Sequence, residues 1–420
     1  MVVAVLIARA RANILRFGPT SALLLLSQAI SAFSLFLLPL LGLQFSDVYS
    51  VGVQTGVGPY NGLVLGVVYL IVIGRPSFDY WKTVDASVIV FAGVLTAYSV
   101  VSALHRGGHH LLGSWLTGAI IVIFGIGGIA LGLASVRGVR QACLGRPWLL
   151  AGITIAPNVG MGLATVMAHF LMPGLAISPL LPAITWAVVA WLVAVVMAVW
   201  PLPQLDRKMT REAPEAGRNK VLHIVGLIVG LITSTVLPIG FVTAAGELNA
   251  GSATVLFLAN RIGAAVVGVL VNAVLMVSIN WEDANRKRVK HSVFFPVASM
   301  ILVVLAVGLH QLQGAAILAY GGVALAWLGL ACSTPIILRE ANVRRMGLVI
   351  MLKGVADLAI SSLALVYFQH APSFTGYFGA LMISQCVTTL VCGGALKQRR
   401  LVVISTLNLL LAIALLAKGW

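Results

Sequence analysis

Residues 178–203 read SPLLPAITWAVVAWLVAVVMAVWPLP, and none of these 26 side chains carries a charge. A helix needs about 20 consecutive apolar residues to cross the hydrocarbon core of a bilayer. A run of this length and composition therefore predicts a transmembrane helix.

Apolar runs of this kind fill most of the chain. Of the 420 residues, 60% are hydrophobic and only 9% are charged, whereas an average soluble domain is about 25% charged. This composition excludes a soluble enzyme, a secreted protein and a disordered chain, and it disfavours an outer-membrane barrel, whose strands alternate polar and apolar residues. We expect an all-α integral membrane protein with twelve spanning helices and a shorter thirteenth. The other runs are 20–43, 48–74, 84–104, 112–134, 147–170, 221–246, 251–279, 292–312, 314–338, 347–368, 376–396 and, shortest, 401–417.

The basic residues alternate from loop to loop. The chain has 27 Lys and Arg residues against 11 Asp and Glu residues, a formal net charge of +16. Counted from the N-terminus, 23 of the 27 fall in alternate loops and two in the loops between them, while the other two lie inside apolar runs. Because cytoplasmic loops carry the excess of Lys and Arg, the pattern predicts a cytoplasmic N-terminus. It also explains the net charge without a nucleic-acid partner.

The longest polar stretch, QLDRKMTREAPEAGRNK at 204–220, lies near the middle of the chain. It predicts a cytoplasmic linker between an N-terminal six-helix lobe (1–203) and a C-terminal six-helix lobe (221–400), with an extra hydrophobic helix at 401–420. The two halves share a faint pattern of prolines, small residues and Arg-rich loops. Transporters are often built from such repeats, with the substrate site between them, so we expect the lobes to surround a central cavity.

Arg261 is the most informative single residue. It stands about ten residues into the run 251–279, which corresponds to a depth of about 15 Å along a helix. An Arg at this depth is costly and nearly always faces a bundle interior or a water-filled cavity. Its planar fork suits phosphate oxygens. We interpret Arg261 as a candidate substrate-binding residue, and a structural ion pair with a neighbouring helix is the alternative.

Lys353 and Asp357 are four residues apart in the run 347–368 and therefore share a helix face. Two interpretations stay open. The pair either neutralises itself and holds its lobe together, or Asp357 is a proton or cation site in which Lys353 acts as a tethered cation. Gln385 and Thr388 in the next run are candidates to complete such an ion-coupling site.

Uncharged polar residues give the first lobe a candidate lining for the cavity. They are Gln28 in the first run and Gln54 and Asn61 in the second. In the fifth run, Pro157 frees a backbone carbonyl beside Asn158 at mid-depth. A cavity-lining hinge and a simple structural kink both remain open for that site.

The sequence predicts no enzymatic chemistry and no cofactor. His105, His109 and His110 cluster in an outer loop, but no acid or Cys accompanies them, so we expect a solvated turn rather than a metal site. There is no Walker motif for ATP hydrolysis. The outer loops are too short to hold the catalytic residues of a membrane glycosyltransferase.

Two stretches carry a resemblance to the multidrug/oligosaccharidyl-lipid/polysaccharide exporter superfamily. Residues 14–53, ILRFGPTSALLLLSQAISAFSLFLLPLLGLQFSDVYSVGV, resemble the opening of Wzx-type polysaccharide flippases. Residues 251–275, GSATVLFLANRIGAAVVGVLVNAVL, are similar to the pattern of MurJ-type lipid II flippases, in which Ala-Asp-Arg precedes a Gly-containing run. Arg261 matches the cavity arginine, and Asn260 stands where those flippases often have Asp. The chain is too short for the fourteen spans of lipid II flippases and lacks the first-span acid of drug exporters, which favours the Wzx-like branch.

The resemblance implies a flippase for a sugar or oligosaccharide on a polyprenyl (pyro)phosphate carrier. It would move this lipid from the inner to the outer leaflet of the bacterial cytoplasmic membrane by alternating access, with Arg261 and Asn260 at the head group. Glycan polymerases and glycosyltransferases are the implied partners, besides membrane lipids. The alternative is a proton- or sodium-coupled exporter of small drugs or metabolites that uses Asp357. A non-transporting scaffold in a polysaccharide assembly complex is a third hypothesis.

Overall fold

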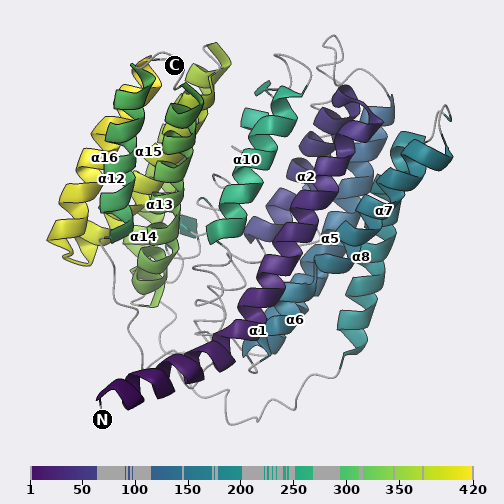
Figure 1. The fold of residues 1–420 in the computed structure, drawn as a ribbon, viewed down its shortest axis with the longest axis horizontal. Coiled ribbons are helices and arrows are strands. Elements are labelled where there is room, and N and C mark those ends of the chain that lie inside the picture. The colour runs from purple at the N-terminus through teal and green to yellow at the C-terminus, as the bar shows by residue number, and fades with distance from the viewer. Residues whose placement is uncertain are drawn as a thin grey trace. The chain divides into compact units, whose positions relative to one another are not determined.

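The chain is described from a computed structural model, drawn in Figure 1. The described residues are 2–63, 90, 93, 94, 97, 115–143, 146–172, 175, 178–200, 222, 225, 226, 229, 233, 240–242, 244, 245, 251–267, 294–311, 316–343, 346–370 and 373–418. The predicted linker 204–220, most of the predicted runs 84–104 and 221–246, and the histidine cluster of the outer loop lie outside them.

Every regular element in these described ranges is a helix, which confirms the predicted all-α class. The elements are α1 (Val2–Leu37), η1 (Leu38–Leu41), α2 (Leu43–Leu63), α5 (Trp115–Cys143), α6 (Pro147–Gly152), α7 (Ile155–Leu171), η3 (Ser178–Leu180), α8 (Leu181–Val199), α10 (Ser252–Val267), α12 (Phe294–His310), α13 (Ala316–Val343), α14 (Gly347–His370), α15 (Phe374–Ala395) and α16 (Arg399–Lys418).

Eight helical segments of the described chain are long and apolar enough to cross a membrane. Each overlaps a predicted run, so the protein is a multi-pass membrane protein. The run 401–417, expected to be marginal, is among them. The segments are Ala22–Leu41, Trp115–Val139, Trp148–Leu171, Ser178–Val199, Leu318–Leu338, Gly347–His370, Phe374–Ala395 and Arg399–Ala417.

The chain divides into two compact units. The first contains Met1–Arg211 and Phe257–Lys287, and the second contains Glu212–Leu256 and Arg288–Trp420. In the first unit α5 packs on α2 and α8, and α7 packs on α1 and α8. In the second unit α15 packs on α13, α14 and α16, while α12 packs on α13 and α16 (Figure 1). The predicted lobe boundaries themselves stay a prediction.

A buried tyrosine ties three helices of the first unit together. The Tyr49 hydroxyl of α2 donates to the carbonyl oxygen of Pro179 at 2.5 Å and accepts from the backbone N–H of Ala183 at 3.1 Å. That N–H lies in the first turn of α8, where a helix has no internal acceptor for it. The Tyr49 ring meets Phe124 of α5 edge-on at 5.6 Å between centroids, and Phe124 meets Trp186 of α8 at 5.1 Å.

The predicted run 147–170 forms two helices rather than one, because α6 ends before Ile153 and α7 begins after Thr154. Pro157 stands in the first turn of α7, where its missing N–H is harmless. Its ring would clash with the carbonyl of Ile153, four residues earlier, if the helix were continuous. The Ser27 and Thr154 hydroxyls are 2.5 Å apart, so α1 supplies a polar partner at the break.

The second unit has its own aromatic core. Phe241 lies edge-on to Phe368 of α14 at 5.2 Å and to Tyr377 of α15 at 5.4 Å between centroids. At the α12–α16 contact, the buried Asn408 amide of α16 donates to the carbonyl oxygen of Pro296 at 2.9 Å. Both contacts join helices that are far apart in the sequence.

We expect Gly127→Ala to destabilise the first unit. A Cβ at Gly127 would lie 2.5 Å from Cζ3 of Trp186 and 2.9 Å from the backbone Cα of Ala187. Forcing α5 and α8 apart should lower the free energy of unfolding by about 1–3 kcal/mol, measured by thermal unfolding in detergent. Gly118→Ala is the matched control on the same helix, because a Cβ there meets nothing within 4 Å. Equal stability of the two variants would contradict the close packing.

Tyr49→Phe should lower the free energy of unfolding by about 1–3 kcal/mol, because it leaves the buried N–H of Ala183 without an acceptor. The same thermal unfolding assay measures the loss. Tyr367→Phe, at a tyrosine that is 38% exposed on α14, is the control and should change little. A Tyr49→Phe protein as stable as the wild type would show that the hydroxyl does not hold α8.

Candidate functional site

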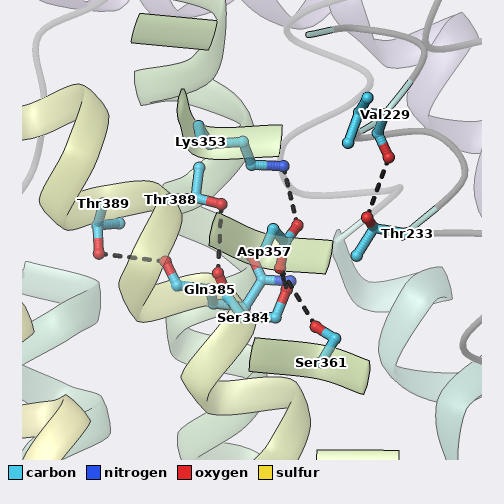
Figure 2. Close-up of polar contacts among 9 residues, drawn as sticks. All are labelled: Val229, Thr233, Lys353, Asp357, Ser361, Ser384, Gln385, Thr388 and Thr389. Atoms are coloured by element: carbon cyan, nitrogen blue, oxygen red, sulfur yellow. Dashed lines mark hydrogen bonds and ion pairs between the residues drawn. The ribbon is translucent and has the colours of Figure 1, made fainter. Parts of the chain in front are cut away.

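A buried polar cluster surrounds Asp357 of α14 in the second unit (Figure 2). The Lys353 ammonium nitrogen lies 3.1 Å from Oδ2 of Asp357. The Ser361 hydroxyl donates to Oδ1 at 3.4 Å, and the Ser384 hydroxyl of α15 donates to the same oxygen at 2.5 Å. The carboxylate therefore receives three groups from two helices.

The spacing of the sequence produces this arrangement. Lys353, Asp357 and Ser361 follow one another at intervals of four, so they line one face of α14. That face is the buried one, and it also carries Gly354 and Ala364. The predicted shared face of Lys353 and Asp357 is observed as a direct ion pair.

The pair lies deep in an apolar segment. Asp357 is ten residues after the first residue of Gly347–His370, a depth of about 15 Å along the helix. The side chains of Lys353 and Asp357 are 11% and 4% exposed. An isolated charge at such a place is very unfavourable, so the two charges must neutralise each other.

The residues predicted to complete the cluster from α15 make other contacts. The Thr388 hydroxyl donates to the backbone carbonyl of Ser384 at 3.2 Å. The Thr389 hydroxyl donates to the backbone carbonyl of Gln385, also at 3.2 Å. Ser384, which the sequence reading did not single out, is the α15 residue that reaches Asp357. Its position four residues before Thr388 was the only sequence signal for it. The ion-coupling roles of Gln385 and Thr388 stay predictions.

Thr233, in the predicted run 221–246, has no described contact with the Asp357 cluster. Thr233 donates to the carbonyl of Val229 at 3.0 Å and points away from Asp357, as Figure 2 shows. This bond gives the Thr233 hydroxyl a backbone acceptor four residues earlier in the chain.

Arg261 of α10 is another charged residue on a described apolar helix, and it belongs to the first unit. Its Nε atom is buried and has no hydrogen-bond partner among the described residues. The guanidinium carbon lies 5.2 Å from the ring centroid of Phe257, one turn earlier on the same helix. The aromatic face gives a cation–π contact but accepts no hydrogen bond at Nε. The neighbouring Asn260 is half-buried.

The other predicted lining residues are spread over the first unit. Asn158 is part of the packed interior: its Oδ1 accepts from Nε1 of Trp186 at 3.2 Å, and its backbone carbonyl accepts from Ser34 at 2.7 Å. Gln54 is buried and Gln28 half-buried. No described contact joins any of the three to Arg261.

Two further polar residues of α2, Asn61 and Asp47, add no contact to either candidate site in the described part of the structure. Asn61 lies on α2, and its side chain is outside the described part of the structure. Asp47 of α2 is a fully buried acid that the sequence reading did not select. Within the described ranges, no three His, Cys, Asp or Glu side chains come together as a metal site.

The ion pair generates a double-mutant prediction. Lys353→Met and Asp357→Asn each leave a buried partner charge uncompensated, so each should lower the free energy of unfolding by about 3–5 kcal/mol. The double variant should regain most of that loss. Thermal unfolding in a sodium-free buffer measures all three, with Arg400→Gln on the exposed surface of α16 as the control. A double variant as unstable as the single ones would contradict mutual neutralisation.

Comparison with known proteins finds a similar fold but no similar sequence. No protein-family model matches the sequence, and no curated protein matches it. The structure is similar to the crystal structure of the eukaryotic MATE transporter AtDTX14, with a TM-score of 0.52 and 15% sequence identity. The similarity covers 97% of this chain and 99% of that chain. At this identity the likeness shows the fold alone: the chain has the all-helical membrane fold seen in a MATE transporter.

Proposed function

We propose that the chain is a flippase that moves a polyprenyl (pyro)phosphate-linked sugar or oligosaccharide from the inner to the outer leaflet of the bacterial cytoplasmic membrane. The observation that carries the proposal is Arg261, a guanidinium inside an apolar helix whose buried Nε has no partner among the described residues. Such a group is expensive unless an anion completes it at some stage of the cycle.

The chemistry of the guanidinium selects the class of anion. Its five N–H groups form a rigid planar fork that matches phosphate oxygens in pairs. The Phe257 ring lies 5.2 Å from the guanidinium carbon and takes none of its N–H groups as a hydrogen-bond acceptor does. Asn260, the residue before Arg261 in the chain, adds a side-chain amide that can bind phosphate or sugar hydroxyls. A diphosphate that carries a sugar uses both kinds of group.

Transport follows from the nature of this substrate. A sugar diphosphate head group cannot cross hydrocarbon unaided, whereas the apolar polyprenyl tail dissolves in the hydrocarbon core of the bilayer. The fold shared with a MATE transporter supports a transporter rather than a passive scaffold. Alternating access around a polar central cavity would carry the head group across while the tail stays in lipid.

A second candidate function rests on the Asp357 cluster. A buried carboxylate between two helices is the kind of group that couples proton or sodium movement to transport, and a proton- or sodium-coupled exporter of small drugs or metabolites would use it. The Lys353 ammonium already neutralises that carboxylate at 3.1 Å, so an external ion would have to compete with it. Drug efflux driven by an ion gradient in vesicles tests this alternative.

The proposal also includes the orientation of the protein in the membrane and the enzymes that it works with. The alternation of Lys and Arg supports a cytoplasmic N-terminus. The substrate would come from membrane glycosyltransferases on the cytoplasmic side and pass to a glycan polymerase on the outer side. These enzymes are the partners that we propose, together with the lipid substrate itself.

Arg261→Ala should reduce flipping of a fluorescent polyprenyl diphosphate sugar in proteoliposomes by about 10- to 100-fold, the equivalent of one charged hydrogen-bond contact. Arg261→Lys keeps the charge but loses the fork, so an intermediate rate is expected. Arg399→Ala, at an exposed arginine on α16, is the control and should flip at the wild-type rate. An Arg261→Ala protein with full activity would remove the central residue of the proposal. A folded wild-type protein that does not flip would favour the scaffold hypothesis.

A further inference from the structure

The contacts within the Asp357 cluster are unevenly shared between its two charges. The carboxylate receives the ammonium on Oδ2 and two hydroxyls, from Ser361 and Ser384, on Oδ1. The ammonium of Lys353 has three N–H donors, and among the described residues only Asp357 accepts from it. The cluster is therefore built around the carboxylate, and the ammonium uses one of its three donors within it.

The packing agrees with a cluster built around the carboxylate. The Lys353–Asp357 contact joins two residues of the same helix, so it ties no helix to another. The bond that links α14 to α15 is the one from Ser384 to Oδ1 of Asp357. Without the lysine, the carboxylate and its two hydroxyls would still meet at this place.

A carboxylate with two hydroxyls also has the chemistry of a site for a small monovalent cation. Hard cations prefer oxygen ligands, and each hydroxyl can rotate its hydrogen away to present a lone pair. Asp357, Ser361 and Ser384 supply four side-chain oxygens within one buried cluster. An ammonium is a compact point charge on a flexible stem, and at Oδ2 of Asp357 it supplies the single positive charge that a Na⁺ would bring to this carboxylate.

We propose that Asp357, Ser361 and Ser384 form a monovalent-cation site and that the Lys353 ammonium, held at Oδ2 of Asp357, keeps Na⁺ out of it by permanently neutralising the carboxylate. The wild-type protein then carries its cation covalently and binds no Na⁺ at this place, while removal of the ammonium opens the site to Na⁺. The inference goes beyond the proposed function, because it concerns cation binding in the absence of any transported lipid.

Sodium titration of purified protein tests the proposal. Wild type, Lys353→Met, Lys353→Arg and the double variant Lys353→Met/Asp357→Asn are compared at pH 8 in NaCl against N-methylglucamine chloride of equal ionic strength. For Lys353→Met we expect saturable binding of radioactive ²²Na⁺ and a rise of roughly 5 °C in the unfolding midpoint at saturating Na⁺. Wild type, Lys353→Arg and the double variant should show neither effect.

Two results would overturn the proposal. The first is Na⁺ binding by the wild type that Asp357→Asn abolishes, which would mean that the lysine does not fill the site. The second is a folded Lys353→Met protein that does not respond to Na⁺. Lys353→Gln, which keeps a polar side chain, replaces Lys353→Met if the latter does not fold, and Asp357→Asn is measured beside the wild type for the first result. Because no lipid substrate is present, these outcomes are independent of whether the flippase function holds.

Discussion

The structure depends on one constraint: a backbone amide or carbonyl inside hydrocarbon has no water to bond, so the chain must satisfy it internally. Helices do this residue by residue, which is why every described element is helical. Where a helix begins, a side chain from a neighbour can take over. The Tyr49 hydroxyl accepts from the backbone N–H of Ala183 in the first turn of α8.

Charges inside the membrane obey the same rule, and the two sites meet it in opposite ways. Asp357 is surrounded by its own chain, with an ammonium and two hydroxyls around one carboxylate. Arg261 has an aromatic face and an unbonded Nε among the described residues. The Asp357 carboxylate has three donors from its own chain, whereas Nε of Arg261 has no acceptor among the described residues. For this reason Arg261 carries the proposed substrate contact and Asp357 does not.

Hydropathy predicted the helices well because it is a local property. The described helices overlap the predicted runs, and the ion pair of Lys353 with Asp357 follows from a spacing of four. Contacts between distant segments were not predictable in this way. Ser384 reaches Asp357 from another helix, and the amide of Asn158, for which a cavity-lining and a structural role were both open, is bonded to Trp186. The sequence predicts a kink or hinge at Pro157, but not the contact between α1 and the junction of α6 with α7, where Ser27 meets Thr154.

The bond between Asn408 and Pro296 has a consequence for the order of assembly. The two residues are 112 positions apart, and both groups are buried where α16 packs on α12. During synthesis, chains emerge from the N-terminus at about 5–20 residues per second, so α12 enters the membrane many seconds before its partner exists. Until α16 arrives, the face of α12 that it will cover meets lipid or a chaperone instead. The second unit therefore completes its packing only after almost all of its chain has left the ribosome.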